Sequence, residues 1–184
     1  MIGNIWNIHI AGNRIYFQSD HAIFYLEKER LHQIACRDII YSALVDKRLY
    51  VAGNGLSVLN GDTLLQLPNS TSYINNMSKR IVGIFPYQNK LLLVSNQHGL
   101  FLYENGTFVP FRSTADEFLK KNRLRCATMK GPLLALGTVQ NGLLLLNLDT
   151  GSTEHISTHN GLQNKAILSL FFDREENLWL GLDN

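Results

Sequence analysis

The sequence predicts an all-β protein built from consecutive antiparallel units of four short strands. Two observations lead to this prediction. A strand–turn–strand pattern returns at regular spacing along the 184 residues, and apolar runs of strand length are bounded by Gly, Asn and Asp. A four-strand unit that recurs every roughly 40 to 50 residues is typical of a β-propeller blade. A β-sandwich or barrel also has evenly spaced strands, but it gives no reason for one unit to recur.

One apolar residue of the second strand marks each unit. These anchors are Ile15, Leu49, Leu91, Leu134 and Leu178, and they are 34, 42, 43 and 44 residues apart. In the first four units a small residue followed by Ile or Leu opens the third strand, namely Ala22, Gly55, Gly99 and Gly142. An apolar run precedes every anchor, and a fourth run completes each of the first four units.

The repeat divides the chain into blades at about 1–35, 36–77, 78–122 and 123–166, with half a blade at 167–184. We therefore expect a partial propeller of about four and a half blades, a fragment of a larger ring. The first strand of each blade should lie nearest the axis. Blades at the two ends of such a fragment should expose apolar faces that a neighbour normally covers, and such faces drive association.

Helix should be scarce, because one segment alone carries a good helix pattern. Residues 113–121, in the connection between the third and fourth blades, read STADEFLKK. Thr114 is expected to cap this helix, and Glu117 three residues later should return the bond as a capping box.

Composition excludes several classes of protein. Hydrophobic residues make up 45% of the chain, and 17 basic and 15 acidic residues are scattered without blocks, so we expect no binding to nucleic acid. The most apolar stretch, 132–148, is interrupted by polar residues well short of the roughly 18 apolar positions of a membrane span. No secretory signal follows Met1, so the protein is cytosolic or its signal lies upstream. Cys36 and Cys126 are predicted to be buried free thiols rather than a disulfide.

No catalytic constellation is recognisable. The six histidines lie in separate blades or turns, without the short spacings that zinc sites favour. The acidic cluster at 173–176 occupies a single turn, which cannot separate two carboxylates across a cleft. No nucleophile motif or phosphate-binding loop occurs. We therefore predict no catalytic residue, no metal, no cofactor and no enzymatic activity for this segment.

Binding is better supported than catalysis. In a blade, the turn between the second and third strands and the connection to the next blade lie on one face. Here these segments are rich in amides, hydroxyls and imidazoles and poor in charge, which suits a neutral polyhydroxylated ligand. The segments are 18–21, 53–54, 95–98, 138–141 and 182–184, with the connections 68–76 and 157–164. Our candidate ligand-binding residues are Asn54, His98, Gln140 and Asn141. The alternative is that such residues are simply common in turns.

The final hairpin carries a specific motif. Gly161-Leu162, Ile167, Ser169-Leu170, Asp173 and Asn177-Leu178-Trp179-Leu180-Gly181 resemble the two-component-regulator propeller repeat. The opening blade is also similar to such repeats. The sequence departs from the family at Glu176, where Gly is usual, at Leu182, where Thr is usual, and at the position of Trp179 in the other four copies.

The motif has a physical interpretation. We expect Asp173 to accept hydrogen bonds from the amides of its own turn and Asn177 to adopt the left-handed conformation of a tight hairpin. Trp179 should offer a flat packing surface to an adjacent blade rather than stack on a ligand.

The resemblance implies a ligand-sensing, extracytoplasmic propeller segment of a hybrid two-component system or a related membrane-tethered transcriptional regulator. Many members of that family are linked to glycan use, and rings of seven blades are typical. It implies a periplasmic location in a membrane-anchored parent, an oligosaccharide-derived ligand, and contacts with further blades, downstream domains and a second copy. The alternatives are part of a propeller glycosidase or polysaccharide lyase, or a protein-interaction propeller. The lack of convergent acidic residues on the predicted binding face favours the sensor.

Overall fold

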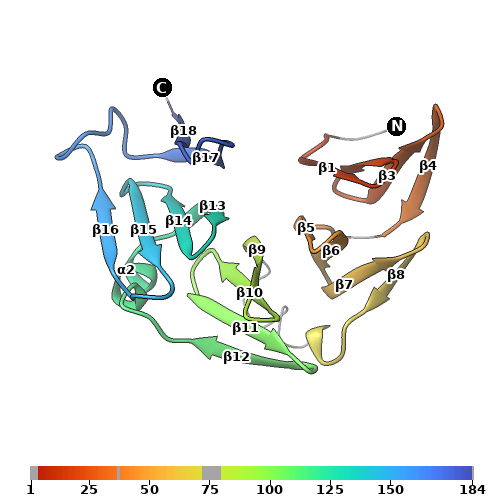
Figure 1. Cartoon of the computed structure of the whole chain (residues 1–184), viewed down its shortest axis with the longest axis horizontal. Coiled ribbons are helices and arrows are strands. Elements are labelled where there is room, and N and C mark those ends of the chain that lie inside the picture. The colour runs from red at the N-terminus through yellow and green to blue at the C-terminus, as the bar shows by residue number, and fades with distance from the viewer. Residues whose placement is uncertain (1–3, 37, 72–79, 184) are drawn as a thin grey trace. The chain divides into compact units, whose positions relative to one another are not determined.

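The computed structural model describes residues 4–36, 38–71 and 80–183 of the chain. Within these ranges, four four-stranded antiparallel sheets follow one another along the sequence, and a two-stranded sheet comes last (Figure 1). Each sheet pairs its strands in sequence order, as a propeller blade does. The predicted all-β propeller fragment is therefore confirmed.

The strand bounds follow the predicted repeat. The first sheet contains β1 (Asn7–Ala11), β2 (Arg14–Gln18), β3 (Ala22–Glu27) and β4 (Arg30–Ala35). The second contains β5 (Tyr41–Val45), β6 (Arg48–Gly53), β7 (Gly55–Asn60) and β8 (Thr63–Gln66). The third contains β9 (Ile81–Tyr87), β10 (Lys90–Ser95), β11 (Leu100–Glu104) and β12 (Thr107–Phe111). The fourth contains β13 (Leu124–Lys130), β14 (Leu133–Thr138), β15 (Leu143–Asn147) and β16 (Thr153–Ile156), and β17 (Ile167–Phe172) pairs with β18 (Leu178–Leu182).

The chain forms two compact units, whose boundary passes through the third sheet. The first unit comprises Met1–Leu92 and Leu102–Val109, and the second comprises Leu93–Phe101 and Pro110–Asn184. Residues 72–76 of the predicted connection 68–76 lie outside the described residues.

In the first unit, an apolar core joins the first two blades. Its buried members are Tyr16, Ile23, Tyr25, Ile34, Ile39, Leu49 and Val51. At its edge the Arg14 guanidinium stacks 4.3 Å from the centre of the Tyr25 ring and forms ion pairs with Glu27 (3.0 Å) and Asp62 (2.8 Å). Because Glu27 belongs to the first blade and Asp62 to the β7–β8 turn, Arg14 links the two blades.

In the second unit, β13 and β14 pack against β17 of the final hairpin. Ile167 is fully buried there, and Gly137 makes room for it. A Cβ atom at Gly137 would lie 2.7 Å from Cys126 Sγ and 2.7 Å from Ile167 Cγ2. The Lys130 ammonium group, at the end of β13, donates to the carbonyl of Asp173 at 2.7 Å. Close packing and this cationic contact therefore hold the hairpin on the fourth blade.

The final hairpin shows why its motif needs these residue types. One carboxylate oxygen of Asp173 accepts the backbone N–H groups of Glu175 (2.9 Å) and Asn177 (2.8 Å). The other oxygen accepts Asn177 Nδ2 (3.0 Å) and the indole N–H of Trp179 (2.8 Å). The predicted role of Asp173 is confirmed. The prediction for Asn177 is wrong, because the left-handed residue is its predecessor Glu176, with φ of 70°. Glycine, the usual residue there, adopts this conformation without steric cost.

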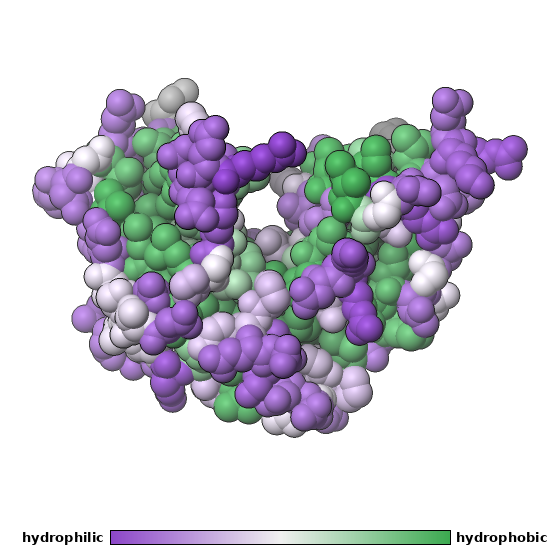
Figure 2. Space-filling model, in the orientation of Figure 1, coloured by the Kyte–Doolittle hydropathy of each residue, from purple (hydrophilic) through white to green (hydrophobic). Residues whose placement is uncertain are grey.

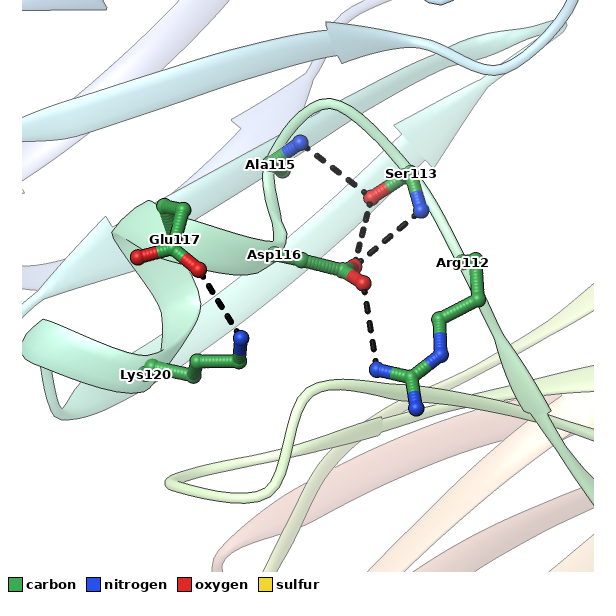
Figure 3. A network of polar contacts seen from close by, with 6 residues as sticks. All are labelled: Arg112, Ser113, Ala115, Asp116, Glu117 and Lys120. Carbon is green, nitrogen blue, oxygen red and sulfur yellow. Dashed lines mark hydrogen bonds and ion pairs between the residues drawn. The ribbon is translucent and has the colours of Figure 1, made fainter.

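The predicted helix is present but shorter, and its predicted cap is wrong. Helix α2 spans Asp116–Lys121 with Ala115 at its N-cap position and no side-chain cap. The Thr114 hydroxyl donates instead to the carbonyl of Gly151 at 2.5 Å. Glu117 pairs with the lysine three residues later rather than with the N-cap amide (Figure 3). A tertiary contact has therefore displaced the local cap.

Apolar side chains remain exposed on strands of both units. Ile8 and Ile10 of β1 are 60% and 69% exposed. Phe171 and Trp179, which face each other across β17 and β18, are each 63% exposed. Figure 2 shows hydrophobic residues gathered in patches between hydrophilic ones on the face that it presents. These strand faces agree with the expectation that a blade fragment leaves apolar surface uncovered.

The two cysteines are free, as predicted, but each is half-buried rather than fully buried. Burial raises the pKa of the Cys126 thiol to about 12, which keeps it protonated and unreactive. Within the described residues, no helix has the length and apolar character needed to cross a membrane.

Candidate functional site

The β10–β11 turn and the connection that follows β12 enclose a pocket of about 220 Å³ in the second unit. Its apolar lining includes the buried side chains of Leu100 and Leu119, together with Pro110 and Phe111 at the end of β12. The turn between second and third strands and the connection to the next blade thus meet here, as the sequence analysis expected for the binding face.

The β10–β11 turn is held from inside by a buried hydroxyl. Ser95 is 1% exposed, and its Oγ accepts the backbone N–H groups of Gln97 (3.5 Å) and His98 (3.2 Å). Its own N–H donates to the carbonyl of Gly99 at 3.0 Å, and Gly99 adopts a φ of 85° that favours glycine. The turn therefore presents Gln97 and His98 at the pocket from a defined backbone.

A buried hydroxyl occupies the equivalent position in two other blades, a feature that was not predicted from the sequence. Ser19 accepts the N–H of Ala22 at 3.1 Å, and Thr138 accepts the N–H of Asn141 at 2.7 Å. Both are buried, like Ser95, and each stands four residues after the anchor of its unit. That fixed offset is the signal that could have revealed them. These buried hydroxyls shape the turns and are not available to a ligand.

The connection contributes the charged groups of the pocket, Arg112, Asp116 and Lys120 (Figure 3). The Asp116 carboxylate accepts the backbone N–H of Ser113 (3.1 Å) and its hydroxyl (3.3 Å), and its other oxygen contacts Arg112 Nη1 at 3.4 Å. Lys120 forms an ion pair with Glu117 at 2.8 Å. These three residues were not predicted from the sequence, although Asp116 and Lys120 lie in the predicted helix 113–121 and Arg112 directly precedes it.

The structure places the four predicted ligand-binding residues in turns that join second and third strands. His98 lines the pocket. Asn141 is used to hold its own surroundings, since its Nδ2 donates to Asn122 Oδ1 (3.0 Å) and its carbonyl accepts His155 Nε2 (2.8 Å). Gln140 is exposed beside it. Asn54 belongs to the first unit, where its carbonyl accepts Gln66 Nε2 at 3.1 Å. A shared role for the four in ligand binding remains a prediction.

The first unit contains a larger hollow of about 390 Å³, between the β1–β2 and β5–β6 turns. Arg14 lines it, but the two ion pairs described above already occupy this guanidinium. We regard this hollow as part of the contact between blades. In the part of the chain that the structure describes, no group of three or more His, Cys, Asp or Glu residues could hold a metal ion.

Comparison with solved structures identifies the extracellular domains of two bacterial proteins, and a WD40 propeller, with the same fold. The extracellular domain of BT3049 from B. thetaiotaomicron, assigned to a hybrid two-component system, superposes with a TM-score of 0.68 and 18% identity over 97% of this chain. That of BT4673 from the same organism, assigned to a one-component system, gives a TM-score of 0.59 and 22% identity, also over 97%. The WD40 β-propeller domain of Doa1 gives 0.72 and 12% over 98%.

These similarities establish the propeller fold and agree with the family that the final hairpin resembles. The chain spans 25% of the BT3049 domain, 32% of the BT4673 domain and 61% of the Doa1 domain. No protein-family model and no curated protein sequence matches the chain.

Proposed function

We propose that this segment is a ligand-sensing part of the extracytoplasmic domain of a membrane-anchored bacterial regulator, of the hybrid two-component or one-component type. Its ligand is derived from a carbohydrate. The observation that carries this proposal is the pocket at the β10–β11 turn. It lies on the predicted binding face of a blade, in a fold shared with the extracellular domains of BT3049 and BT4673.

The chemistry of the pocket supports a saccharide. Sugar rings combine apolar C–H faces with hydroxyl groups, and the pocket sets Pro110 and Phe111 beside Gln97 and His98. Amide and imidazole groups can donate and accept hydrogen bonds, as hydroxyl groups require. A volume of about 220 Å³ is below the roughly 300 to 1,000 Å³ of most small-molecule sites. The pocket therefore takes one sugar ring of a longer ligand.

The same pocket argues for sensing rather than hydrolysis. Glycoside hydrolysis usually needs two carboxylates across the scissile bond. Of the described residues that line the pocket, Asp116 alone carries a carboxylate, and its oxygens already accept hydrogen bonds from Ser113 and contact Arg112. A sensor domain therefore fits better than a glycosidase or lyase, and the segment itself has no enzymatic activity.

The exposed apolar strand faces support partners of the same architecture. Ile8 and Ile10 on β1, and Phe171 and Trp179 on the final hairpin, are the kind of surface that an adjacent blade covers. Further blades of the parent chain cover them, and downstream domains and a second copy complete the receptor.

Binding by the purified chain tests the proposal. A panel of plant, algal and host oligosaccharides, titrated by calorimetry and NMR, should include at least one ligand that shifts the resonances of the β10–β11 turn. The double variant Gln97→Ala/His98→Ala should lower the affinity for that ligand by about tenfold or more, because two hydrogen bonds are lost. The matched control is His21→Ala, in the corresponding turn of the first blade. The proposal is wrong if no saccharide binds, if the double variant binds like the parent, or if the chain turns the saccharide over.

A further inference from the structure

Two cationic side chains line the pocket at the β10–β11 turn, and a neutral sugar would not require them. Arg112 and Lys120 both line it; Arg112 directly follows β12, and Lys120 lies in the last turn of α2. We infer that the pocket recognises an acidic saccharide, whose carboxylate binds to Arg112 with support from Lys120. This inference rests on the proposed function and replaces the neutral ligand that the turn composition had suggested.

The Asp116 carboxylate does not neutralise Arg112 fully, because it is engaged elsewhere. One of its oxygens accepts both the N–H and the hydroxyl of Ser113, at 3.1 and 3.3 Å. The Asp116 side chain is 23% exposed and is held in place by these bonds. Its contact with Arg112 is long, at 3.4 Å, and involves one guanidinium nitrogen (Figure 3). Asp116 therefore orients Arg112 and leaves most of its donors free.

The free donors of Arg112 suit a planar acid. A guanidinium carries five N–H donors in a fixed fork that matches a carboxylate with two parallel hydrogen bonds. In the part of the chain that the structure describes, the Arg112 side chain makes the single contact with Asp116 and is 77% exposed. A ligand carboxylate can therefore approach it without breaking a buried interaction.

Lys120 and the apolar lining complete the argument. Lys120 and its partner Glu117 are 62% and 72% exposed, and such a surface pair is weak enough to reorganise around a ligand. Pro110 and Phe111 offer the apolar surface on which the C–H face of a ring can rest. A uronic acid has both parts, an apolar face and a carboxylate.

The test compares matched acidic and neutral probes on the whole chain. Glucuronate, glucose and glucose 6-sulfate are titrated while NMR follows the side-chain resonances of Arg112 and His98. Glucuronate should bind about tenfold or more tightly than glucose, because one charge-assisted pair is added. Arg112→Gln should remove this preference, and Arg112→Lys should restore part of it, since the charge returns without the fork. Lys121→Gln, which removes an exposed cation outside the pocket, should leave the preference unchanged.

Each outcome decides one of the two proposals. Equal binding of glucuronate and glucose, or a preference that survives Arg112→Gln, overturns the inference and leaves the saccharide sensor intact. If glucose 6-sulfate binds more tightly than glucuronate, the inference of a carboxylate ligand is wrong and the pocket recognises a sulfate. No binding by any oligosaccharide, acidic or neutral, overturns the proposed function itself. Because Arg112 is largely exposed, its substitution should not unfold the protein, and unchanged circular dichroism checks this.

Discussion

Replacing Glu176 with glycine is expected to stabilise the final hairpin. Glu176 has φ of 70°, a left-handed conformation that costs a residue with a side chain about 1–2 kcal/mol. Glycine removes that cost but increases the freedom of the unfolded chain, which offsets about 0.5–1 kcal/mol. The contact between Glu176 and Lys130 is long, at 3.8 Å, and the glutamate is 78% exposed, so its loss matters little. Lys130 keeps its hydrogen bond to the Asp173 carbonyl.

The net gain should be about 0.5–1 kcal/mol, which raises the melting temperature by about 1–4 °C in a domain of this size. Thermal unfolding followed by circular dichroism measures it. Glu175→Gly is the matched control, because Glu175 occupies the same turn and is not among the residues with positive φ. It should destabilise by about 0.5–1 kcal/mol, the usual cost of a glycine. If both variants shift the melting temperature in the same direction by similar amounts, left-handed strain at Glu176 is not the cause.

Three further predictions follow from the packing and the protonation of single residues. Gly137→Ala should destabilise by about 1–3 kcal/mol, because the new methyl group would meet Ile167 Cγ2 at 2.7 Å; an unchanged urea midpoint would contradict this. Burial lowers the pKa of His9, so the unfolded chain binds this proton at a higher pH than the folded protein does. The free energy of unfolding should therefore fall as the pH drops below about 6.5. In urea titrations, His9→Gln should abolish this dependence on pH. The hydrogen bond from the Trp179 indole holds the pKa of Asp173 below its ordinary value. The stability that the carboxylate contributes is therefore lost only as the pH falls through this lowered pKa. The indole N–H resonance of Trp179 should keep its native position until that point. A change centred at or above the ordinary pKa of aspartate would refute this.

The features that local chemistry determines were predictable from the sequence, and those that depend on tertiary contacts were not. Half a blade was predicted at 167–184, and the strands β17 and β18 lie there, because apolar runs around a polar turn specify them. The cap of α2 was misplaced because Thr114 bonds to Gly151, which is distant in sequence. The left-handed residue was misplaced by one position, since Asn is the more usual choice and Glu176 precedes it.

The pocket illustrates the same limit. His98 could be proposed from its turn, because every blade places such a turn on the binding face. Arg112 and Lys120 could not, since their approach to that turn depends on how the chain after β12 folds back towards it. The turns alone consequently predicted a face poor in charge, whereas Arg112 and Lys120 line the pocket beside His98. Helical connections between blades can therefore contribute charged residues to a ligand-binding face that the turns alone do not reveal.

The order of strands within each sheet has a consequence for how the chain folds as it is synthesised. In the ranges that the structure describes, each strand pairs with a strand next to it in the sequence, so none of these sheets depends on a distant segment. Short loops close quickly and at low entropic cost, and proteins with local contacts fold fast. Each blade can therefore close its hydrogen bonds soon after its fourth strand leaves the ribosome. The hairpin of β17 and β18 then folds against the preceding blade, where the Lys130 ammonium group at the end of β13 donates to the carbonyls of Asp173 and Arg174.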